Sequence, residues 1–248
     1  MRLDDMLKQK FPELYVSGDI MTKSWLPLEA NPEVLTTYAQ KLGLPLSIEF
    51  HDILGTEDWA LEMLPSPLYA VVLLFPISEA SENERRSTSV ETSGLCSYYM
   101  TQKVGNACGT VAVLHSLLNI YANKQIDFVS DSYVSRMYSA TLSLNSEERG
   151  KWLEMNQEIE SAHLFTESMG QSVTPTDTDT EVDTHFVTFL LGSDNKTVFE
   201  LDGRRSGPVN RGVCTSSSDF GSHVLQIIKT EFIDKNSNDI RFSLLGLA

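Results

Sequence analysis

The stretch Gln102-Lys-Val-Gly-Asn-Ala-Cys-Gly-Thr110 is the starting point for predicting both the fold and the chemistry of this chain. The residues from Cys108 to about Asn123 carry few charges and predict a buried helix, which places Cys108 in its first turn. A thiolate there is stabilised by the positive end of the helix dipole, which lowers the pKa of the thiol. Gly109 leaves room for a substrate carbonyl, and the free N–H groups of the first turn, together with the side-chain amide of Gln102, suit an oxyanion.

A nucleophilic thiol needs a base, and the chain contains five histidines. His115 lies two helical turns beyond Cys108, too far along the helix to touch its sulfur. His185 opens a predicted strand whose hairpin partner ends at Asp202. Adjacent antiparallel strands can bring these two side chains together, and Asp202 would then orient the imidazole as the third member of a triad. A His–Asp pair at hairpin distance arises readily by chance, so the pair alone is a weak indication.

Hydrophobic periodicity predicts an α/β domain around these residues. Helices are expected at 32–42, around 59–64, at 108–123, from 146 and from 218, and strands at 46–54, 69–75, 185–191, 197–201 and 240–247. The run at 69–75 (YAVVLLF) is apolar on both faces, which is typical of a central strand. The polar segment 78–93 predicts a mobile surface insert. Between about 163 and 184 the periodicity is lost, which predicts a long loop of the kind used as a lid or binding loop.

Composition excludes several classes of protein. The formal net charge of −15 disfavours nucleic acid as a partner and suits a basic one, although it also serves solubility alone. The three cysteines are widely spaced and form no CxxC pair, which argues against a disulfide framework or a zinc site and fits a reducing compartment. No apolar run is long enough to span a membrane, and residues 1–11 lack the apolar core of a signal peptide. We therefore expect a cytoplasmic protein, present also in the nucleus, without membrane contact, metal or cofactor.

Six ordered motifs resemble the ubiquitin C-terminal hydrolase family of cysteine peptidases (family C12), and its short L3-type members in particular. They are WLPLEANPE (25–33), LLFP (73–76), Gln102 with NACGT (106–110), DTHF (183–186), ELDGR (200–204) and RF (241–242). The resemblance covers residues 25–248 and is most specific at the nucleophile segment. It leaves residues 1–24 as an N-terminal extension without a family counterpart. It implies a papain-like fold, with a mostly antiparallel sheet flanked by helices, a knotted backbone and a crossover loop at about 163–184.

The resemblance also implies roles for individual residues. Cys108 would be the nucleophile, His185 the general base and acid, Asp202 its orienting carboxylate, and Gln102 the oxyanion donor. The enzyme would act as a monomer on ester, thioester or amide bonds at the C-terminal glycine of ubiquitin, or of the related modifier NEDD8. The crossover loop would restrict it to small or flexible leaving groups.

Contacts with ubiquitin are expected in two places. Five acidic residues of the crossover loop would meet the two arginines in ubiquitin's tail: Glu167, Asp177, Asp179, Glu181 and Asp183. Their charges are equally consistent with a solvated loop that makes no specific contact. Pro27 and Leu28 would touch ubiquitin's apolar surface; without the family resemblance they would form an N-terminal anchor.

Two other functions remain open from the sequence. One is a ubiquitin-binding module of the same fold without catalysis, although a binder needs none of the four predicted catalytic side chains. The other is a papain-type protease or amidase with an unrelated substrate, which shares the chemistry but does not require an acidic crossover loop.

Overall fold

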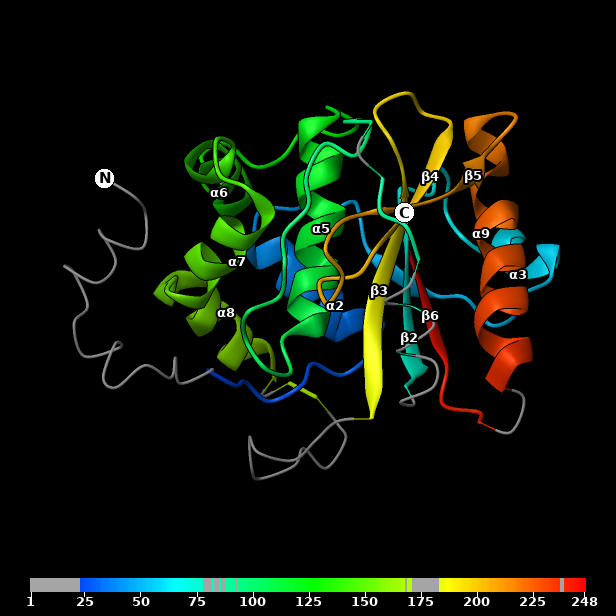
Figure 1. Cartoon of the computed structure of the whole chain (residues 1–248), viewed down its shortest axis with the longest axis horizontal. Helices are drawn as coiled ribbons and strands as arrows, with labels where there is room; N and C mark the ends of the chain where they lie inside the picture. The colour runs from blue at the N-terminus through cyan, green and yellow to red at the C-terminus, as the bar shows by residue number, and fades with distance from the viewer. Residues whose placement is uncertain are drawn as a thin grey trace.

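In the part of the chain that the structure describes, six antiparallel strands form one sheet through the middle of the molecule (Figure 1). The structure is a computed structural model that describes residues 23–77, 82, 85, 88–91, 93–167, 169–170, 183–236 and 239–248. In order across the sheet, the strands are β1 (Phe50–Asp52), β6 (Ser243–Leu247), β2 (Ala70–Pro76), β3 (Thr184–Leu191), β4 (Thr197–Leu201) and β5 (Val209–Val213). The predicted hairpin of the two strands after residue 184 is present as the antiparallel pair β3–β4.

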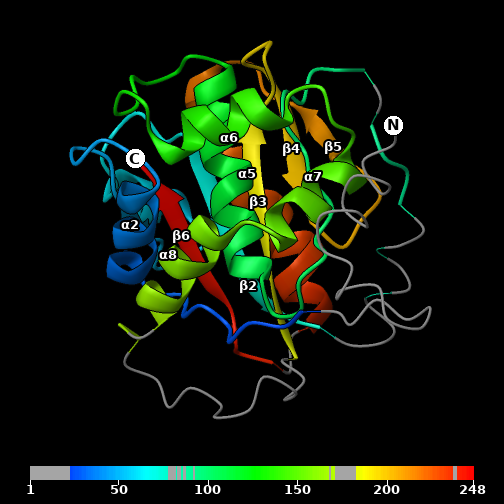
Figure 2. The same ribbon diagram turned by 90° about the vertical axis from the view of Figure 1, so that its left-hand side faces the viewer.

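Helices cover both faces of this sheet. On one face lie α2 (Pro32–Lys41), α5 (Cys108–Ala122), α6 (Tyr133–Thr141), α7 (Ser146–Glu154) and α8 (Gln157–Glu167), and on the other lie α3 (Asp58–Glu62) and α9 (Phe220–Ile228). Figure 2 shows α5 between the outer helices and the sheet. Thirteen of the fifteen residues of α5 are buried, as its low charge predicts. This architecture agrees with the predicted α/β fold and its mostly antiparallel sheet.

Strand β2 is apolar on both sides, so helices must pack against both faces of the sheet. Successive side chains of a strand point to opposite faces. Ala70 and Val72 accordingly belong to the apolar core beneath α5, whereas Val71 and Leu73 belong to a second core beneath α9. The strand is therefore interior, as its unbroken apolar sequence indicates.

Some predicted elements differ from the structure. The strand expected at 46–54 is only three residues long, and the helices α6 and α8 and the edge strand β5 were not anticipated. The helix expected from Ser146 is present, but its cap is Asn145, whose side chain accepts from the N–H of Glu148 in a capping box. The helix expected from 218 begins at Phe220, after a short 3₁₀ turn.

The predicted boundary of the crossover loop is wrong at its start. Helix α8 continues to Glu167, because His163 and Thr166 are buried against the core. Threonine has a low helix propensity, and tertiary packing overrides it here. The rest of the predicted loop, apart from 169, 170 and 183, lies outside the described residues, and the predicted knot stays a prediction.

Two residues before the predicted start of the catalytic domain also contact it. Lys23 accepts a main-chain hydrogen bond from Gly105 at 2.8 Å, and its side chain pairs with Glu160 at 2.6 Å. The ordered contacts therefore begin before Trp25, and residues 1–22 lie outside the described part. Among the described residues, none of the helices combines the length and apolarity needed to cross a membrane.

Candidate active site

Cys108 is the first residue of α5, as predicted. The chain reaches it through Asn106, whose φ of 57° lies in the left-handed region that asparagine tolerates better than most residues. No side chain caps this end of the helix, so N–H groups of its first turn remain available to a ligand. The Cys108 side chain is almost fully buried, and a Cβ added at Gly109 would lie 3.1 Å from Leu28 Cβ, which explains why glycine follows the cysteine.

His185 and Asp202 meet as the hairpin predicts. His185 is the second residue of β3, Asp202 follows the last residue of β4, and the distance from His185 Nε2 to Asp202 Oδ1 is 2.6 Å. Both side chains are buried. A short hydrogen bond between buried groups fixes the ring orientation and leaves Nδ1 for another group.

The Cys108 thiol interacts with the imidazole of His185. Burial opposes ionisation of the thiol, but the imidazole of His185 outweighs this effect and holds the pKa of Cys108 below its ordinary value. Burial likewise disfavours the imidazolium, yet Asp202 and the thiol together raise the pKa of His185 to about 9. Each group therefore favours the charged form of the other, and the pair is suited to a thiolate–imidazolium state.

Gln102 lies in a loop that packs against the residues after β4. Its main-chain N–H donates to the carbonyl oxygen of Gly203 at 2.7 Å, and its side-chain Nε2 donates to the carbonyl oxygen of Val104 at 2.9 Å. The amide donor is thus engaged within its own loop here. The role of Gln102 as an oxyanion donor stays a prediction.

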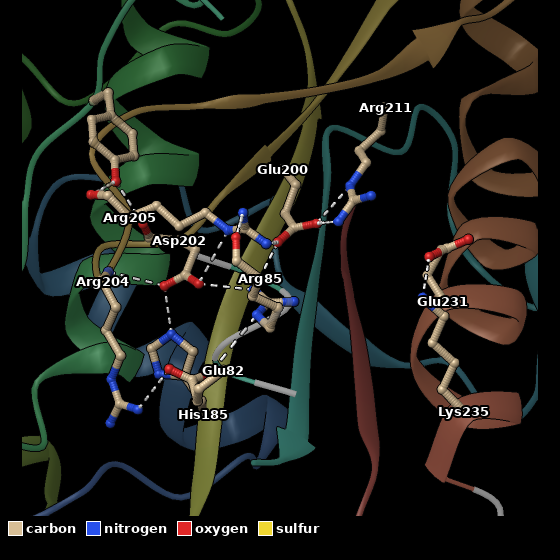
Figure 3. A network of polar contacts seen from close by, with 11 residues as sticks. Glu82, Arg85, His185, Glu200, Asp202, Arg204, Arg205, Arg211, Glu231 and Lys235 are labelled. Carbon is tan, nitrogen blue, oxygen red and sulfur yellow. Dashed lines mark hydrogen bonds and ion pairs between the residues drawn. The ribbon is translucent and has the colours of Figure 1, made fainter. Parts of the chain in front are cut away.

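A buried network of charges surrounds Asp202, and sequence reasoning missed it (Figure 3). Glu200 of β4 is fully buried and pairs with Arg85 at 2.7 Å and with Arg211 at 2.6 Å. Asp202 pairs with the same Arg85 at 2.8 Å through Oδ2, the oxygen that His185 does not use. One signal could have revealed the network: a glutamate inside an otherwise apolar strand needs cationic partners.

The loop that carries Asp202 is held by the aromatic residue Tyr99 as well. Its hydroxyl lies 2.6 Å from the carbonyl oxygen of Asp202 and 2.7 Å from that of Arg205, so one proton serves two acceptors. The main-chain N–H of Arg204 donates to Asp202 Oδ1 at 2.9 Å. These contacts fix the backbone and the carboxylate of Asp202 together.

The residues expected to contact ubiquitin differ in burial, and three of them lie outside the described residues. Leu28 is only 4% exposed and packs in the core beneath α5, and Pro27 beside it is half-buried; their contact with ubiquitin stays a prediction. Asp183 is exposed and pairs with Arg241 at 2.6 Å. Glu167 is the last residue of α8. Asp177, Asp179 and Glu181 lie outside the described residues. The described ranges contain no group of three or more His, Cys, Asp or Glu side chains suited to a metal ion.

Comparisons with known proteins show the family of this chain. Residues 25–233 match the family model described as ubiquitin carboxyl-terminal hydrolase, family 1. A probable ubiquitin carboxyl-terminal hydrolase of Dictyostelium discoideum is 41% identical over 233 residues, which cover 91% of this chain and 88% of the relative. Ubiquitin carboxyl-terminal hydrolase 3 of Arabidopsis thaliana is 37% identical over 232 residues, and the match covers 92% of this chain and 95% of the relative.

A solved structure has the same fold. It is the Trichinella spiralis UCH37 catalytic domain bound to ubiquitin vinyl methyl ester, with a TM-score of 0.71 and 23% identity, covering 92% of this chain and 96% of that one. The papain-like α/β fold expected from the sequence is thereby confirmed.

Proposed function

Because this chain belongs to family 1 of the ubiquitin carboxyl-terminal hydrolases, a family of cysteine peptidases, we propose that its Cys108 hydrolyses bonds to the C-terminal glycine of ubiquitin. The protein is a deubiquitinating enzyme of the thiol-dependent kind. The bonds concerned are esters, thioesters or amides that carry a small or flexible leaving group.

The observation that carries this proposal is the buried 2.6 Å hydrogen bond between Asp202 and His185, whose imidazole interacts electrostatically with the Cys108 thiol at the start of α5. It supports a nucleophile with a lowered pKa and a base whose charged form is stabilised by a carboxylate. All three groups are buried, and electrostatic interactions are stronger there than in water.

The reaction has two halves. The Cys108 thiolate forms a bond to the carbonyl carbon of ubiquitin's last glycine, and the resulting oxyanion faces the N–H groups at the start of α5 and the amide of Gln102. The bond to the leaving group then breaks, and the imidazolium of His185 gives its proton to the departing atom. Water, deprotonated by His185, attacks the thioester and releases ubiquitin with a free carboxylate and Cys108 as a thiol.

A ubiquitin probe with a C-terminal electrophile tests this function. The wild-type chain should form one covalent adduct, and Cys108→Ala should form none while retaining ubiquitin binding. Cys96 is half-buried and its pKa is raised to about 12 by burial, so Cys96→Ala provides a matched control that should label normally. Normal turnover by Cys108→Ala would refute the assignment. Binding of ubiquitin without adduct formation by the wild type would indicate a non-catalytic module instead.

The preference between ubiquitin and NEDD8 is part of the same proposal. We propose ubiquitin as the main substrate, with NEDD8 as a second one. Hydrolysis rates on fluorogenic ubiquitin and NEDD8 substrates distinguish the two. Cleavage of a short peptide as fast as a ubiquitin substrate would instead indicate a papain-type protease with an unrelated substrate.

We also propose that the enzyme is a monomer of the cytosol and nucleus, with residues 25–248 as its catalytic domain. All three cysteines are free, which suits a reducing compartment. Analytical ultracentrifugation and cell fractionation test the oligomeric state and the compartment.

A further inference from the structure

Arg85 reaches the candidate active site from the polar segment at 78–93, which the sequence predicted to be a mobile surface insert. Its Nη2 lies 2.8 Å from Asp202 Oδ2 and 2.7 Å from Glu200 Oε1, and its side chain is only 11% exposed (Figure 3). Asp202 therefore has a different cationic partner on each oxygen, with His185 at Oδ1 and Arg85 at Oδ2.

The guanidinium of Arg85 is held by more than these two carboxylates. It lies 4.7 Å from the ring centre of Phe75 and 5.2 Å from that of Phe232, both within the range of cation–π attraction. The carbonyl oxygen of Arg85 also accepts a hydrogen bond from Arg205. A buried cation with aromatic faces and two carboxylates around it occupies a defined position, because its removal would take one cationic partner from each carboxylate.

We propose that Arg85 is a positioning residue for the hydrolysis: it holds Asp202 with Oδ1 directed at His185 and shares the negative charge of that carboxylate. This inference rests on the proposed function of Cys108, His185 and Asp202. It adds a fourth side chain on which the orientation of the imidazole depends.

No other described arginine takes the same place. Arg205 approaches Asp202 Oδ2 only to 3.6 Å and Glu200 Oε1 only to 3.7 Å, beyond hydrogen-bonding distance in both cases. Arg211 pairs with Glu200 but forms no ion pair with Asp202 among the described contacts. Without Arg85, Glu200 would keep Arg211, whereas Asp202 would lose the partner that fixes its second oxygen.

The charge of Arg85 also has a predictable effect on titration. Asp202 would carry a less compensated negative charge without it, which stabilises the imidazolium of His185 and disfavours the thiolate of Cys108. Both titrations would then move to higher pH. Among the described residues, the charged and titratable groups that face Asp202 and His185 are Glu82, Arg85, Tyr99, Cys108, His115, Glu200, Arg204 and Arg205. Arg211 pairs with Glu200 and not with Asp202.

Three variants test the proposal: Arg85→Gln, Arg85→Lys and the matched control Arg211→Gln, which removes a charge from Glu200 alone. The measurements are kcat and KM on a fluorogenic ubiquitin substrate across pH, with thermal unfolding as a check on folding. We expect Arg85→Gln to lower kcat on the order of tenfold to a hundredfold, with a smaller change in KM and both limbs of the pH–rate profile shifted upward. Arg85→Lys should restore the position of the limbs but only part of the rate. Arg211→Gln should keep the wild-type profile.

A wild-type pH profile in Arg85→Gln would overturn the proposal, as would an equal shift in Arg211→Gln. Should Arg85→Gln fail to fold, Arg85→Lys decides alone: a rate and a pH profile equal to those of the wild type would refute a positioning role for the guanidinium. Cys108→Ala, measured on the same substrate, distinguishes a failure of the proposed function from a failure of the role proposed for Arg85. Turnover in that variant refutes the proposed function, whereas an effect of neither Arg85 variant refutes only the role of Arg85.

Discussion

The main-chain N–H of Gln102 donates a 2.7 Å hydrogen bond to the carbonyl oxygen of Gly203. The first residue belongs to the loop before the nucleophile, and the second directly follows Asp202. A Cβ added at Gly203 would lie 2.8 Å from Val111 Cγ1 and 3.0 Å from Gln102 Cβ, so the two loops approach as closely as glycine allows. Gln102, the predicted oxyanion donor, and Asp202, the orienting carboxylate, therefore lie on two loops that this hydrogen bond joins.

Substitution of Gln102 should affect the rate and leave the backbone tie intact, because that tie uses only the main-chain N–H. We expect Gln102→Ala to lower kcat on the order of a hundredfold to a thousandfold, the usual cost of one oxyanion donor. The KM for a fluorogenic ubiquitin substrate should change little. Steady-state kinetics measure both quantities.

Gln102→Glu provides the matched control, since it keeps the size of the side chain but replaces the amide donor with a carboxylate. It should be at least as slow as Gln102→Ala. A rate near that of the wild type in both variants would mean that the N–H groups of α5 stabilise the oxyanion unaided.

The part of the site that local pairing builds could be predicted from the sequence. His185 and Asp202 are 17 residues apart and belong to one hairpin, so strand periodicity alone places them near each other. Cys108 could be placed at a helix start because the helix after it is uniformly apolar. In both cases the deciding interactions are close in sequence.

The part that depends on distant tertiary contacts could not be predicted. Arg85 is 117 residues from Asp202 and lies in a polar segment without periodicity, which resembles a solvated insert. The last turn of the unanticipated helix α8 could not be predicted for a related reason: burial of His163, rather than propensity, keeps that turn helical.

Asp202→Asn should shift the pH dependence of the enzyme. Although burial disfavours the imidazolium, the charge of Asp202 and its hydrogen bond are the first causes that raise the pKa of His185 to about 9. Without that charge the pKa of His185 falls, the basic limb of the pH–rate profile moves to lower pH, and the thiolate loses its counterion. We expect kcat/KM to drop on the order of a hundredfold or more.

Asp194→Asn is a suitable control, because Asp194 lies in the turn of the same β3–β4 hairpin and bonds to Thr197. It should leave the limbs of the profile in place even if the hairpin becomes less stable. An unshifted basic limb in Asp202→Asn would mean that other groups hold the imidazolium.

His163 should make the stability of the fold depend on pH. It is buried, with Nδ1 2.8 Å from the Thr110 hydroxyl and Nε2 2.8 Å from the carbonyl oxygen of Leu26, and burial lowers its pKa to about 4. The unfolded chain takes up a proton near pH 6.5 and the folded chain does not. The contribution of His163 to the free energy of unfolding is therefore complete above pH 6.5. It declines as the pH falls toward 4, by about 1.4 kcal/mol per pH unit.

Chemical denaturation at several pH values between 7 and 4.5 measures this slope. His163→Gln should reduce it, because no proton is taken up at that position on unfolding. Thr110→Val removes the hydroxyl partner but keeps the histidine, so it should lower stability more evenly across pH and retain the slope. Identical slopes in the wild type and His163→Gln would contradict the prediction.

Ubiquitin association should depend on salt, and Arg241 offers a way to test where the charge acts. Acidic residues before β3 were expected to attract the basic tail of ubiquitin, and Asp183, one of them, is paired with Arg241 at 2.6 Å. Exposed ion pairs of this kind contribute little to stability, so Arg241→Ala should leave the fold intact while it uncovers the charge of Asp183. We expect the association rate to rise roughly twofold at low salt, and the gain to vanish as salt screens it.

Arg136→Ala is the control, because it changes the net charge equally on α6. That helix lies at the opposite end of the molecule from the start of β3 (Figures 1 and 2), so the variant should have a smaller effect. Stopped-flow association at several salt concentrations measures this. A response to salt that is flat, or equal in the two variants, would mean that the acidic loop does not steer ubiquitin.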